Sequence, residues 1–425
     1  SWGVLWGPPG TGKTHTIAAQ VVAALSDPTE RILVVSTTNR ATDEVARRIG
    51  QLAAERGHDL HGILRLGGGA DLAHFADAGL SELLVGGESE LRWRRSAVRR
   101  ARDRSTDPEE RARLGAEDRA LGTALQEAPG LFVARARRVV VTTAFAAEQR
   151  LDRDAAVRAL VDGGRAPFTT LIVDEAGLMA RARIGALALL AGRRVLLVGD
   201  PQQLAPIARL GRILPREEAQ WLAGSALSAL TLRDAARPDV TLLTKQHRMA
   251  PDICAAVSAY QYGGRLIDAA SVLDRAAPFG PPFAAGHRAL WWVLDTQEPD
   301  PIELHAARGP GGRSWVRPSS LRCFLRLLRA HPDLAAAQGL FVSPFRAQVA
   351  AARAALDRED RATWSASTVH AQQGAEADVV VFDTVHAGSG AWDSAEWGRL
   401  INVGLSRARH LLVVLAARQE MTEPF

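Results

Sequence analysis

The chain has 425 residues, 47% of them hydrophobic, and a chain of this length is expected to form more than one hydrophobic core. It contains no run of about 20 apolar residues, so we expect neither a membrane-spanning helix nor a membrane partner. The two cysteines, Cys254 and Cys323, lie far apart without CxxC spacing, which argues against a disulfide framework or structural zinc and favours a reducing, cytoplasmic location. The net charge of +5 permits a polyanionic partner without requiring one.

Short runs rich in Val, Leu and Ile recur along the chain, and each ends in Gly, Asp, Ser or Thr. Continuous apolar strands of this kind are typical of parallel sheets covered by helices on both faces. Five runs lie before about residue 200 (WGVLWG, RILVVSTT, RVVVTTA, TTLIVDEAG, VLLVGDPQ), and three follow about residue 339 (GLFVSPF, DVVVFDTV, HLLVVLAA). The sequence therefore predicts an α/β fold with two parallel sheets, in a first lobe over 1–245 and a second lobe over 246–425.

The stretch GVLWGPPGTGKTHTIAAQVVAAL contains a strand, a phosphate loop of the form GxxxxGK[ST] and an apolar helix, in the order that this motif requires. Glycines in such a loop let backbone amides turn toward the phosphate oxygens of ATP, and the helix N-terminus assists them. We expect Lys13 to reach the β and γ phosphates and Thr14 to bind Mg²⁺. The predicted nucleotide-binding positions in the loop are Gly7, Gly10, Thr11, Gly12, Lys13 and Thr14.

Residues 53–137 contain no run of the strand type and are expected to form a helical insertion in the first lobe. Within the insertion, residues 91–113 (LRWRRSAVRRARDRSTDPEERAR) hold nine arginines and four acidic residues. A solvated helical face and a contact with nucleic acid explain this excess equally well. Both interpretations stay open at the level of the sequence.

TLIVDEAG places Asp174 and Glu175 at the carboxyl end of a strand. An acidic pair after a strand is often only a helix cap, but behind a phosphate loop it predicts nucleotide hydrolysis. Asp174 is expected to hold Mg²⁺, and Glu175 to orient and deprotonate the attacking water. VLLVGDPQQLAPI then ends a neighbouring strand close to Gln203, whose amide can hydrogen-bond the γ-phosphate.

Charged residues of the predicted second lobe complete the hydrolysis site. Arg248 in KQHRMAP and Arg407 in RLINVGLSRARHLLVVL are two candidates for an arginine that stabilises charge on the γ-phosphate in the transition state. In STVHAQQGAEADVVVF, the Gln373-Gly374 turn and Glu376 directly precede a strand, at a sheet edge that can face the nucleotide. An arginine supplied by a second lobe would couple ATP hydrolysis to lobe closure.

Taken in order, GPPGTGKT, VVSTTNRATDEV, VVVTTA, DEAG, GDPQQLAP, QHRMAP, FVSPFRAQ, TVHAQQGAEAD and NVGLSRAR resemble the motifs of superfamily 1B helicases, in the branch that includes the nonsense-mediated-decay helicase and senataxin. The resemblance spans nearly the whole chain, and only 53–137 and 260–338 lie largely outside it. It implies two RecA-like lobes that use ATP and Mg²⁺ to move along single-stranded DNA or RNA, in the 5′ to 3′ direction. The sequence does not distinguish DNA from RNA.

The resemblance also implies roles that spacing alone does not give. His247 stands where relatives often place a tyrosine against the adenine, and Glu376 stands where the ribose is bound. Further positions match residues that grip the nucleic-acid backbone, although each threonine among them is also an ordinary strand-end cap. They are Thr38, Asn39, Thr142, Thr143, Pro344 and Thr368.

Besides His247, two features depart from the family pattern. Leu178 follows DEAG where relatives commonly show an amide, which puts one link between ATP and nucleic acid in doubt. The glutamine that recognises adenine in the family is expected upstream of residue 1, so the chain resembles a fragment. We expect it to act as a monomer or as part of a larger chain. Without that glutamine, His247 and the ribose contact are expected to select poorly among nucleotide bases.

AAA+ ATPases that remodel proteins share GPPGTGKT and are the main alternative. They have one α/β lobe and take their arginine from a neighbouring subunit, whereas TVHAQQGAEAD and NVGLSRAR lie on a second set of strands in this chain. A nucleic-acid-binding scaffold without ATPase activity is a third alternative, and the complete set of predicted hydrolytic residues argues against it.

Overall fold

The computed structural model describes residues 1–134, 136–206, 213–275, 279–280, 283, 289–294, 306–309, 311–312, 314–372, 376–386 and 391–417. The chain divides into two compact units. The first contains Ser1–Trp6, Gly12–Asp200 and Ala205–Thr241, and the second contains Gly7–Thr11, Pro201–Leu204 and Leu242–Phe425. Among the helices in the described ranges, none is both long and apolar enough to cross a membrane.

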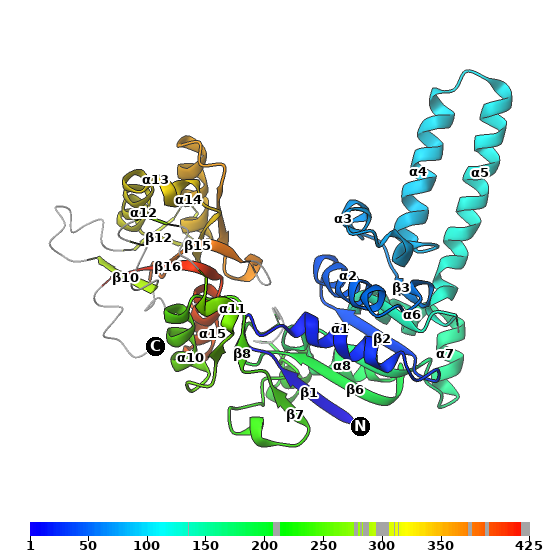
Figure 1. Ribbon diagram of the computed structural model, residues 1–425, viewed down its shortest axis with the longest axis horizontal. Helices are drawn as coiled ribbons and strands as arrows, with labels where there is room; N and C mark the ends of the chain where they lie inside the picture. The colour runs from blue at the N-terminus through cyan, green and yellow to red at the C-terminus, as the bar shows by residue number, and fades with distance from the viewer. Residues whose placement is uncertain are drawn as a thin grey trace. The chain divides into compact units, whose positions relative to one another are not determined.

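A seven-stranded sheet forms the centre of the first unit (Figure 1). Its spatial order is β3 (Ile63–Arg65), β4 (Val139–Thr143), β2 (Ile32–Ser36), β5 (Phe168–Val173), β6 (Ala191–Gly199), β1 (Trp2–Trp6) and β7 (Val240–Leu242). The pairs from β3 to β1 are all parallel, so these strands end at one edge of the sheet. The apolar side chains of β2, β4 and β5 pack into one cluster that includes Leu33, Val140 and Leu171.

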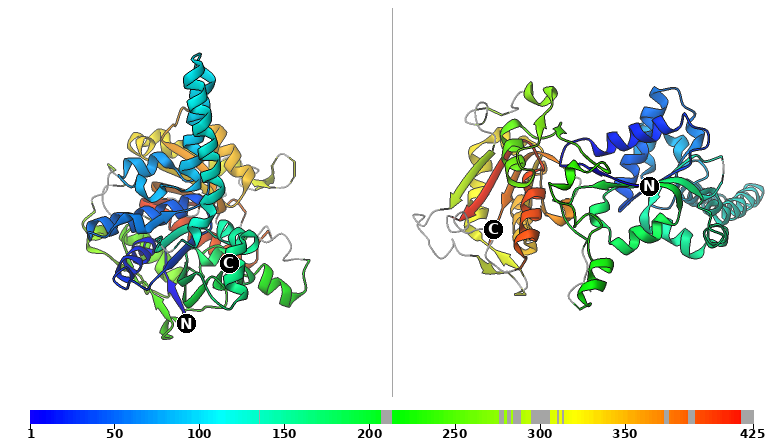
Figure 2. Two further views of the ribbon diagram at one scale, coloured as in Figure 1. Left: turned by 90° about the vertical axis from the view of Figure 1, so that its right-hand side faces the viewer. Right: turned by 90° about the horizontal axis from the view of Figure 1, so that it is seen from below.

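Helices surround this sheet and leave one long hairpin extending from it. The hairpin consists of α4 (Glu88–Arg104) and α5 (Pro108–Glu127), which lie side by side and project away from the sheet in Figures 1 and 2. Its own small core contains Leu91, Val98, Leu114 and Leu121. The other helices are α1 (Lys13–Ala24), α2 (Asn39–Glu55), α3 (Leu72–Asp77), α6 (Ala144–Arg153), α7 (Ala155–Asp162), α8 (Arg181–Ala188) and α9 (Arg216–Leu222).

The second unit is built on a five-stranded parallel sheet. Its spatial order is β10 (Ala289–Leu294), β16 (Ala408–Ala417), β15 (Ala377–Asp383), β13 (Gly339–Ser343) and β14 (Trp364–Thr368). Two small pairs accompany it, the parallel β8 (Lys245–Gln246) with β9 (Ile267–Asp268), and the antiparallel β11 (Ala307–Arg308) with β12 (Trp315–Val316). The helices are α10 (Pro251–Gln261), α11 (Ala270–Leu273), α12 (Pro318–Ala330), α13 (Pro332–Ala336), α14 (Arg346–Arg358) and α15 (Ser394–Leu405).

The predicted α/β class with parallel sheets is confirmed, and each of the eight apolar runs forms a strand. One expectation is wrong in detail, because the range 53–137 contains the edge strand β3 as well as helices. β3 has only three residues and ends on Arg65, so its apolar run is too short to stand out. β14 was missed for a different reason, since the sequence WSAST contains two serines and a threonine although most of it is buried.

Candidate active site

The phosphate loop connects β1 to α1, and two of its glycines adopt conformations that favour glycine. Gly10 has φ 73° and Gly12 has φ 80°. A Cβ on Gly10 would lie 2.6 Å from the Arg248 Cβ, in the second unit to which both residues belong. The Gly10 carbonyl accepts a 2.8 Å hydrogen bond from the backbone N–H of His247. The loop therefore has the backbone geometry that lets amides turn toward phosphate.

Asp174 and Glu175 directly follow β5 in the first unit and occupy different environments. Asp174 is 5% exposed and accepts a 3.2 Å hydrogen bond from the Ser36 hydroxyl, whereas Glu175 is partly exposed and has φ 53°. Burial, followed by the Glu175 charge, raises the pKa of Asp174 to about 7, and the Lys13 ammonium opposes both. A non-glycine residue with positive φ next to a perturbed carboxyl is typical of functional sites.

The acidic pair fits a magnesium ion. A divalent cation favours the charged form of a carboxyl, so it would offset the burial that now raises the pKa of Asp174. Carboxylate and hydroxyl oxygens are the ligands that Mg²⁺ prefers, together with substrate phosphates. Asp174 and Thr14 are the residues that would hold it, and the ion would neutralise charge on the phosphates.

The carboxyl ends of β1 and β6 are joined by a buried side-chain contact that the sequence did not reveal. Trp6 is fully buried, and its Nε1 donates a 2.9 Å hydrogen bond to the Asp200 carboxylate. Gln203 follows in the segment that belongs to the second unit and is also buried. Within that unit, Asn402 Nδ2 donates to the carbonyl of Gln202 at 2.8 Å. Asn402 comes from NVGLSRAR and was not among the predicted residues.

Gln246 shapes the turn that carries His247 and Arg248. Its fully buried amide oxygen accepts from the backbone N–H groups of Arg248 and Met249, both at 2.8 Å. Its amide nitrogen donates to the Met249 carbonyl and to the Asp268 carboxylate. Gln246 therefore fixes the turn, while His247 is exposed at its surface. The sequence pattern alone did not separate this structural role from a catalytic one.

The two candidate arginines, both in the second unit, differ in their exposure and in their hydrogen-bond partners. Arg248 is partly exposed, and its Nε donates to Glu376 at 2.7 Å, so the structure brings these two predicted residues together. Arg407 is 2% exposed, and its Nε donates to the Val403 carbonyl at 3.0 Å. Arg248 is the more accessible candidate for a contact with nucleotide. The predicted Gln373-Gly374 turn lies outside the described residues.

The predicted backbone-gripping residues of the first unit lie shortly after β2 (Thr38 and Asn39) and at the end of β4 (Thr142 and Thr143). Thr38 is exposed and caps α2 by accepting from the Ala41 N–H, and Thr143 caps α6 in the same way from Ala146. Thr142 is 1% exposed, and its hydroxyl donates to a backbone carbonyl at 2.8 Å. Thr142 is thus directed into the protein, and Thr38 and Thr143 lie nearer the surface.

Asn39 is the most constrained of these residues. It is exposed, yet its Oδ1 accepts a 2.9 Å hydrogen bond from Nη2 of the buried Arg65. Arg65 in turn donates to Asp43 at 2.7 Å and to the Leu66 carbonyl at 2.7 Å. A Cβ on Gly69 would lie 2.3 Å from the Asn39 Nδ2, so that glycine leaves room for the amide. Because its oxygen is engaged, Asn39 offers amide donors to any ligand at this edge.

The predicted contacts of the second unit follow neighbouring strands. Pro344 comes directly after β13 and is buried, while Thr368 ends β14 and is partly exposed. The Ser343 hydroxyl accepts from the Phe345 N–H at 3.3 Å and fixes the turn into α14. Both positions lie at the carboxyl edge of the second sheet, because β13 and β14 are parallel.

A strand, phosphate loop and helix, an acidic pair at the end of a parallel strand, and a second parallel sheet define a P-loop nucleoside triphosphatase with two α/β units. Two family models, each described as an AAA domain, match residues 1–209 and 225–419. The chain belongs to the superfamily 1 helicases, in the branch that includes the nonsense-mediated-decay helicase and senataxin, so the prediction from its motifs is confirmed.

Curated relatives match almost the whole chain. It is 25% identical to the ATP-dependent helicase NAM7 of Saccharomyces cerevisiae, over 97% of the chain and 39% of that protein. It is 26% identical to the DNA-binding protein SMUBP-2 of Mesocricetus auratus, over 98% of the chain and 41% of that protein. It is 23% identical to the RNA helicase Mov10l1 of Homo sapiens, over 97% of the chain and 31% of that protein. The chain thus spans less than half the length of these relatives.

Two solved viral structures align with the chain. The PRRSV helicase covers 99% of this chain and 53% of its own, with a TM-score of 0.43 and 15% identity. The alignment with an Arterivirus nonstructural protein 10 (helicase), in complex with DNA, covers 98% of this chain and 60% of that one, with a TM-score of 0.44 and 11% identity.

Proposed function

We propose that this chain is the motor of an ATP-dependent helicase, which hydrolyses ATP with Mg²⁺ and moves along single-stranded nucleic acid. The observation that carries the proposal is the buried Asp174 beside Glu175 at the end of β5, within the electrostatic influence of Lys13. Membership of the superfamily 1 helicases supports it. We extend the proposal to 5′ to 3′ movement, to action as a monomer or within a larger chain, and to a cytoplasmic location.

The roles of the hydrolytic residues follow from their environments. Glu175 is more exposed than Asp174, so it can accept a proton from the attacking water while Asp174 serves the metal. Lys13 contributes a fixed positive charge to the β and γ phosphates. Arg248 contributes a second one, and Gln203 an amide that hydrogen-bonds the γ-phosphate. In the structure, Nε of Arg248 is engaged by the Glu376 carboxylate.

The nucleic-acid partner is proposed as a single strand held by its backbone. Thr38 and Asn39 are exposed just after β2, and Asn39 presents amide donors that suit phosphate or sugar oxygens. Contacts of this kind position a strand without reading its sequence, which a moving motor requires. The names of the relatives include both a DNA-binding protein and an RNA helicase, so both polymers are candidates.

The test is ATP hydrolysis by the purified chain, measured alone and with single-stranded DNA or RNA of matched sequence. We expect hydrolysis that requires Mg²⁺ and is stimulated by at least one polymer. Lys13→Ala and Glu175→Gln should abolish turnover, whereas Lys245→Ala, a change at the other lysine, should not. Undiminished hydrolysis in Lys13→Ala or Glu175→Gln would refute the assigned site. Hydrolysis that no polymer stimulates would refute the helicase proposal.

A further inference from the structure

Three side chains form a stack around the small β11–β12 hairpin of the second unit. The guanidinium carbon of Arg308 lies over the ring of Trp315, 4.2 Å from its centroid. The His386 ring meets the same indole edge-to-face, with centroids 4.5 Å apart and planes at 89°. Arg308 is exposed, while Trp315 and His386 are partly exposed. A cation over an indole face is an attractive arrangement, and the contact limits the freedom of a long side chain.

His386 is placed by a strained turn at the end of β15. Its N–H donates to the Thr384 carbonyl at 2.7 Å around Val385, whose φ is 60°. A γ-turn with positive φ is the rare and strained form, and a β-branched residue makes it less favourable still. The surrounding structure has to impose such a turn, and strained backbone of this kind gathers at functional sites.

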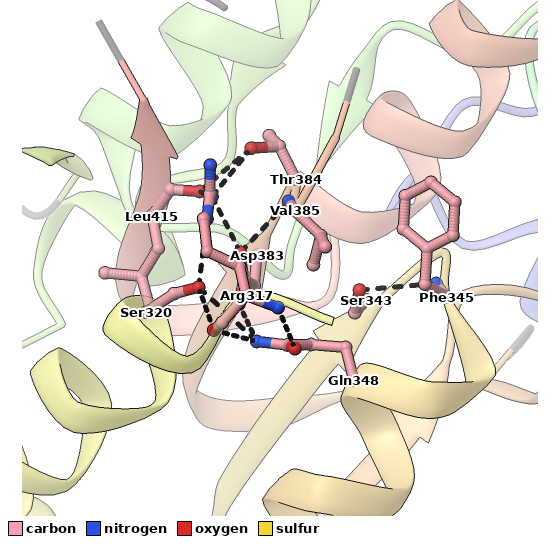
Figure 3. Close-up of polar contacts among 9 residues, drawn as sticks. All are labelled: Arg317, Ser320, Ser343, Phe345, Gln348, Asp383, Thr384, Val385 and Leu415. Atoms are coloured by element: carbon pink, nitrogen blue, oxygen red, sulfur yellow. Dashed lines mark hydrogen bonds and ion pairs between the residues drawn. The ribbon is translucent and has the colours of Figure 1, made fainter. Parts of the chain in front are cut away.

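A buried ion pair imposes the turn (Figure 3). The Asp383 carboxylate accepts from the Val385 N–H at 3.1 Å and from Arg317 Nη2 at 3.0 Å. It also accepts from Gln348 Nε2 at 2.6 Å, and Arg317 reaches the carbonyl of Leu415 on β16. Both members of the pair are almost completely buried. The network thus joins α12, α14, β15 and β16 beneath the turn that carries His386.

The stack lies at the same sheet edge as the predicted contacts of this unit. β13 and β15 are parallel neighbours, so Pro344 and His386 follow adjacent strand ends. The hairpin packs on the start of α14, where the Ser314 hydroxyl accepts from the Ala347 N–H at 3.1 Å. A Cβ on Gly309 would lie 2.5 Å from the Ala347 Cβ, so the hairpin approaches that helix closely. The stack is therefore part of the edge and not a separate surface.

We infer that Arg308, oriented by Trp315 and His386, is a contact for the single-stranded nucleic acid of the proposed helicase. This inference rests on the proposed function and adds a site to it. A planar guanidinium binds phosphate through its N–H edges and stacks on a base through its face, so it recognises any sequence. Because the indole already orders the Arg308 side chain, less conformational freedom is lost when a strand binds. Trp315 and His386 are positioning residues.

The first experiment measures equilibrium binding of fluorescent oligothymidylate and oligouridylate to the complete chain over a range of salt concentrations. Arg308→Ala should weaken binding about 5- to 150-fold, as expected when a stacking contact is lost. It should also lower the salt slope by about 0.7, as expected for one lost phosphate contact on a single strand. Arg153→Ala, a change at an exposed arginine of the first unit, should alter neither value.

The second experiment separates positioning from simple structure. Trp315→Phe keeps a ring under Arg308 and should retain most of the affinity. Trp315→Leu keeps an apolar side chain but no ring, and should lose part of the affinity that Arg308→Ala loses. Trp221→Ala, at an exposed tryptophan of α9, is the matched control and should bind normally. Equal losses for Trp315→Phe and Trp315→Leu would show that Trp315 does not act through stacking and would overturn its role.

The outcomes distinguish this inference from the proposed function. If the unaltered chain binds oligonucleotides and Arg308→Ala binds them with the same affinity and salt slope, the Arg308 site is refuted and the helicase proposal stands. If the unaltered chain binds neither polymer and its ATPase responds to neither, both are refuted. A weaker affinity together with a smaller salt slope in Arg308→Ala, but not in Arg153→Ala, supports the site.

Discussion

Replacing Arg317 by methionine tests the buried network of the second unit directly. Arg317→Met keeps a long apolar side chain and removes the charge that faces Asp383. The carboxylate would keep three donors, the Ser320 hydroxyl, Gln348 Nε2 and the Val385 N–H, and would lose its only guanidinium contact among the described residues. We therefore expect a folded variant that is markedly less stable than the unaltered chain.

The expected loss follows from the burial of the pair. Removing one partner of a buried ion pair costs about 3–5 kcal/mol, because the remaining charge is left without compensation. Because the Asp383 carboxylate retains three hydrogen bonds, we place the loss for Arg317→Met at the lower end of this range, about 3 kcal/mol. For a unit of this size that loss corresponds to a decrease of about 6–12 °C in Tm. Arg329→Met is the matched control, since its ion pair with Glu359 is exposed and should contribute less than about 1 kcal/mol.

The pH dependence provides an independent signature. Burial raises the pKa of Asp383 in the folded chain, with Arg317 and hydrogen bonds opposing the rise, so loss of Arg317 should raise the pKa further. When the pKa of Asp383 is higher in the folded chain than in the unfolded chain, where it is about 4, the folded state is favoured at pH values below about 4. This stabilisation is lost as the pH rises through the pKa of Asp383 in the folded chain. The instability of Arg317→Met should therefore be larger at pH 8 than at pH 5.

The assay is urea-induced unfolding of the single variants and the double variant Arg317→Met/Asp383→Asn at both pH values. We expect the double variant to recover about 1–2 kcal/mol relative to Arg317→Met at pH 8, because the uncompensated charge is gone. Full stability of Arg317→Met at pH 8, or a loss that does not change with pH and is not relieved in the double variant, would refute the reasoning.

Three further predictions concern the site, the hairpin and a thiol. Arg248→Ala should lower kcat for ATP by about a hundredfold or more with a much smaller change in nucleotide affinity, and an equal loss of affinity would make Arg248 a ground-state binding residue. In the α4–α5 hairpin, Arg95 and Arg99 donate to Asp118, whereas Arg94 and Arg100 bond only within their own helix among the described contacts. Replacing Arg94 and Arg100 by acidic residues should thus flatten the salt dependence of single-strand binding if the hairpin contacts nucleic acid. The same charge reversal at Arg95 and Arg99 should mainly separate the two helices, which thermal unfolding would measure. Burial, followed by the neighbouring Asp268, raises the pKa of Cys254 to about 12, so this thiol should resist alkylation at pH 8 until the chain unfolds.

The sequence predicted the sheets well because burial on both faces produces continuous apolar runs. β2, β13 and β15 carry hardly any polar residues before their ends, and each was recognised. Strands that depart from this pattern were missed, and so was the apolar β10. β3 lies at the edge of its sheet and is short, and the two serines and the terminal threonine of β14 are not typical of a buried strand.

The site was predictable where its chemistry is local in sequence. The phosphate loop and the acidic pair each occupy one short segment, so residue type and spacing were sufficient. The polar networks were not predictable, because their partners are distant in the chain. Trp6 and Asp200 are separated by 194 positions, Arg317 and Asp383 by 66, and Arg65 and Asn39 by 26. No local pattern marks such pairs, and only folding brings them together.

Thr142 shows a different reason why the sequence could not predict every site residue. Adjacent threonines at the end of β4 were assigned the same role, yet one hydroxyl is directed inward and the other caps a helix. Alternation along a strand would normally separate the two faces. In β4 both faces are covered by the protein, so the apolar pattern does not show which side chain of the pair reaches the surface.

The two units use buried arginines in the same way. Arg65 and Arg317 each pair with a buried aspartate, reach a backbone carbonyl and bond a polar side chain close to a strand end. Stability alone does not call for such pairs, since apolar residues of similar volume often serve as well or better. A guanidinium has five donors in a fixed plane, so it can join several segments in one geometry, which a lysine cannot do. One arginine orients Asn39, and the other underlies the turn that carries His386. What these ion pairs supply is therefore the defined geometry of the two sheet edges at which the proposed strand contacts lie.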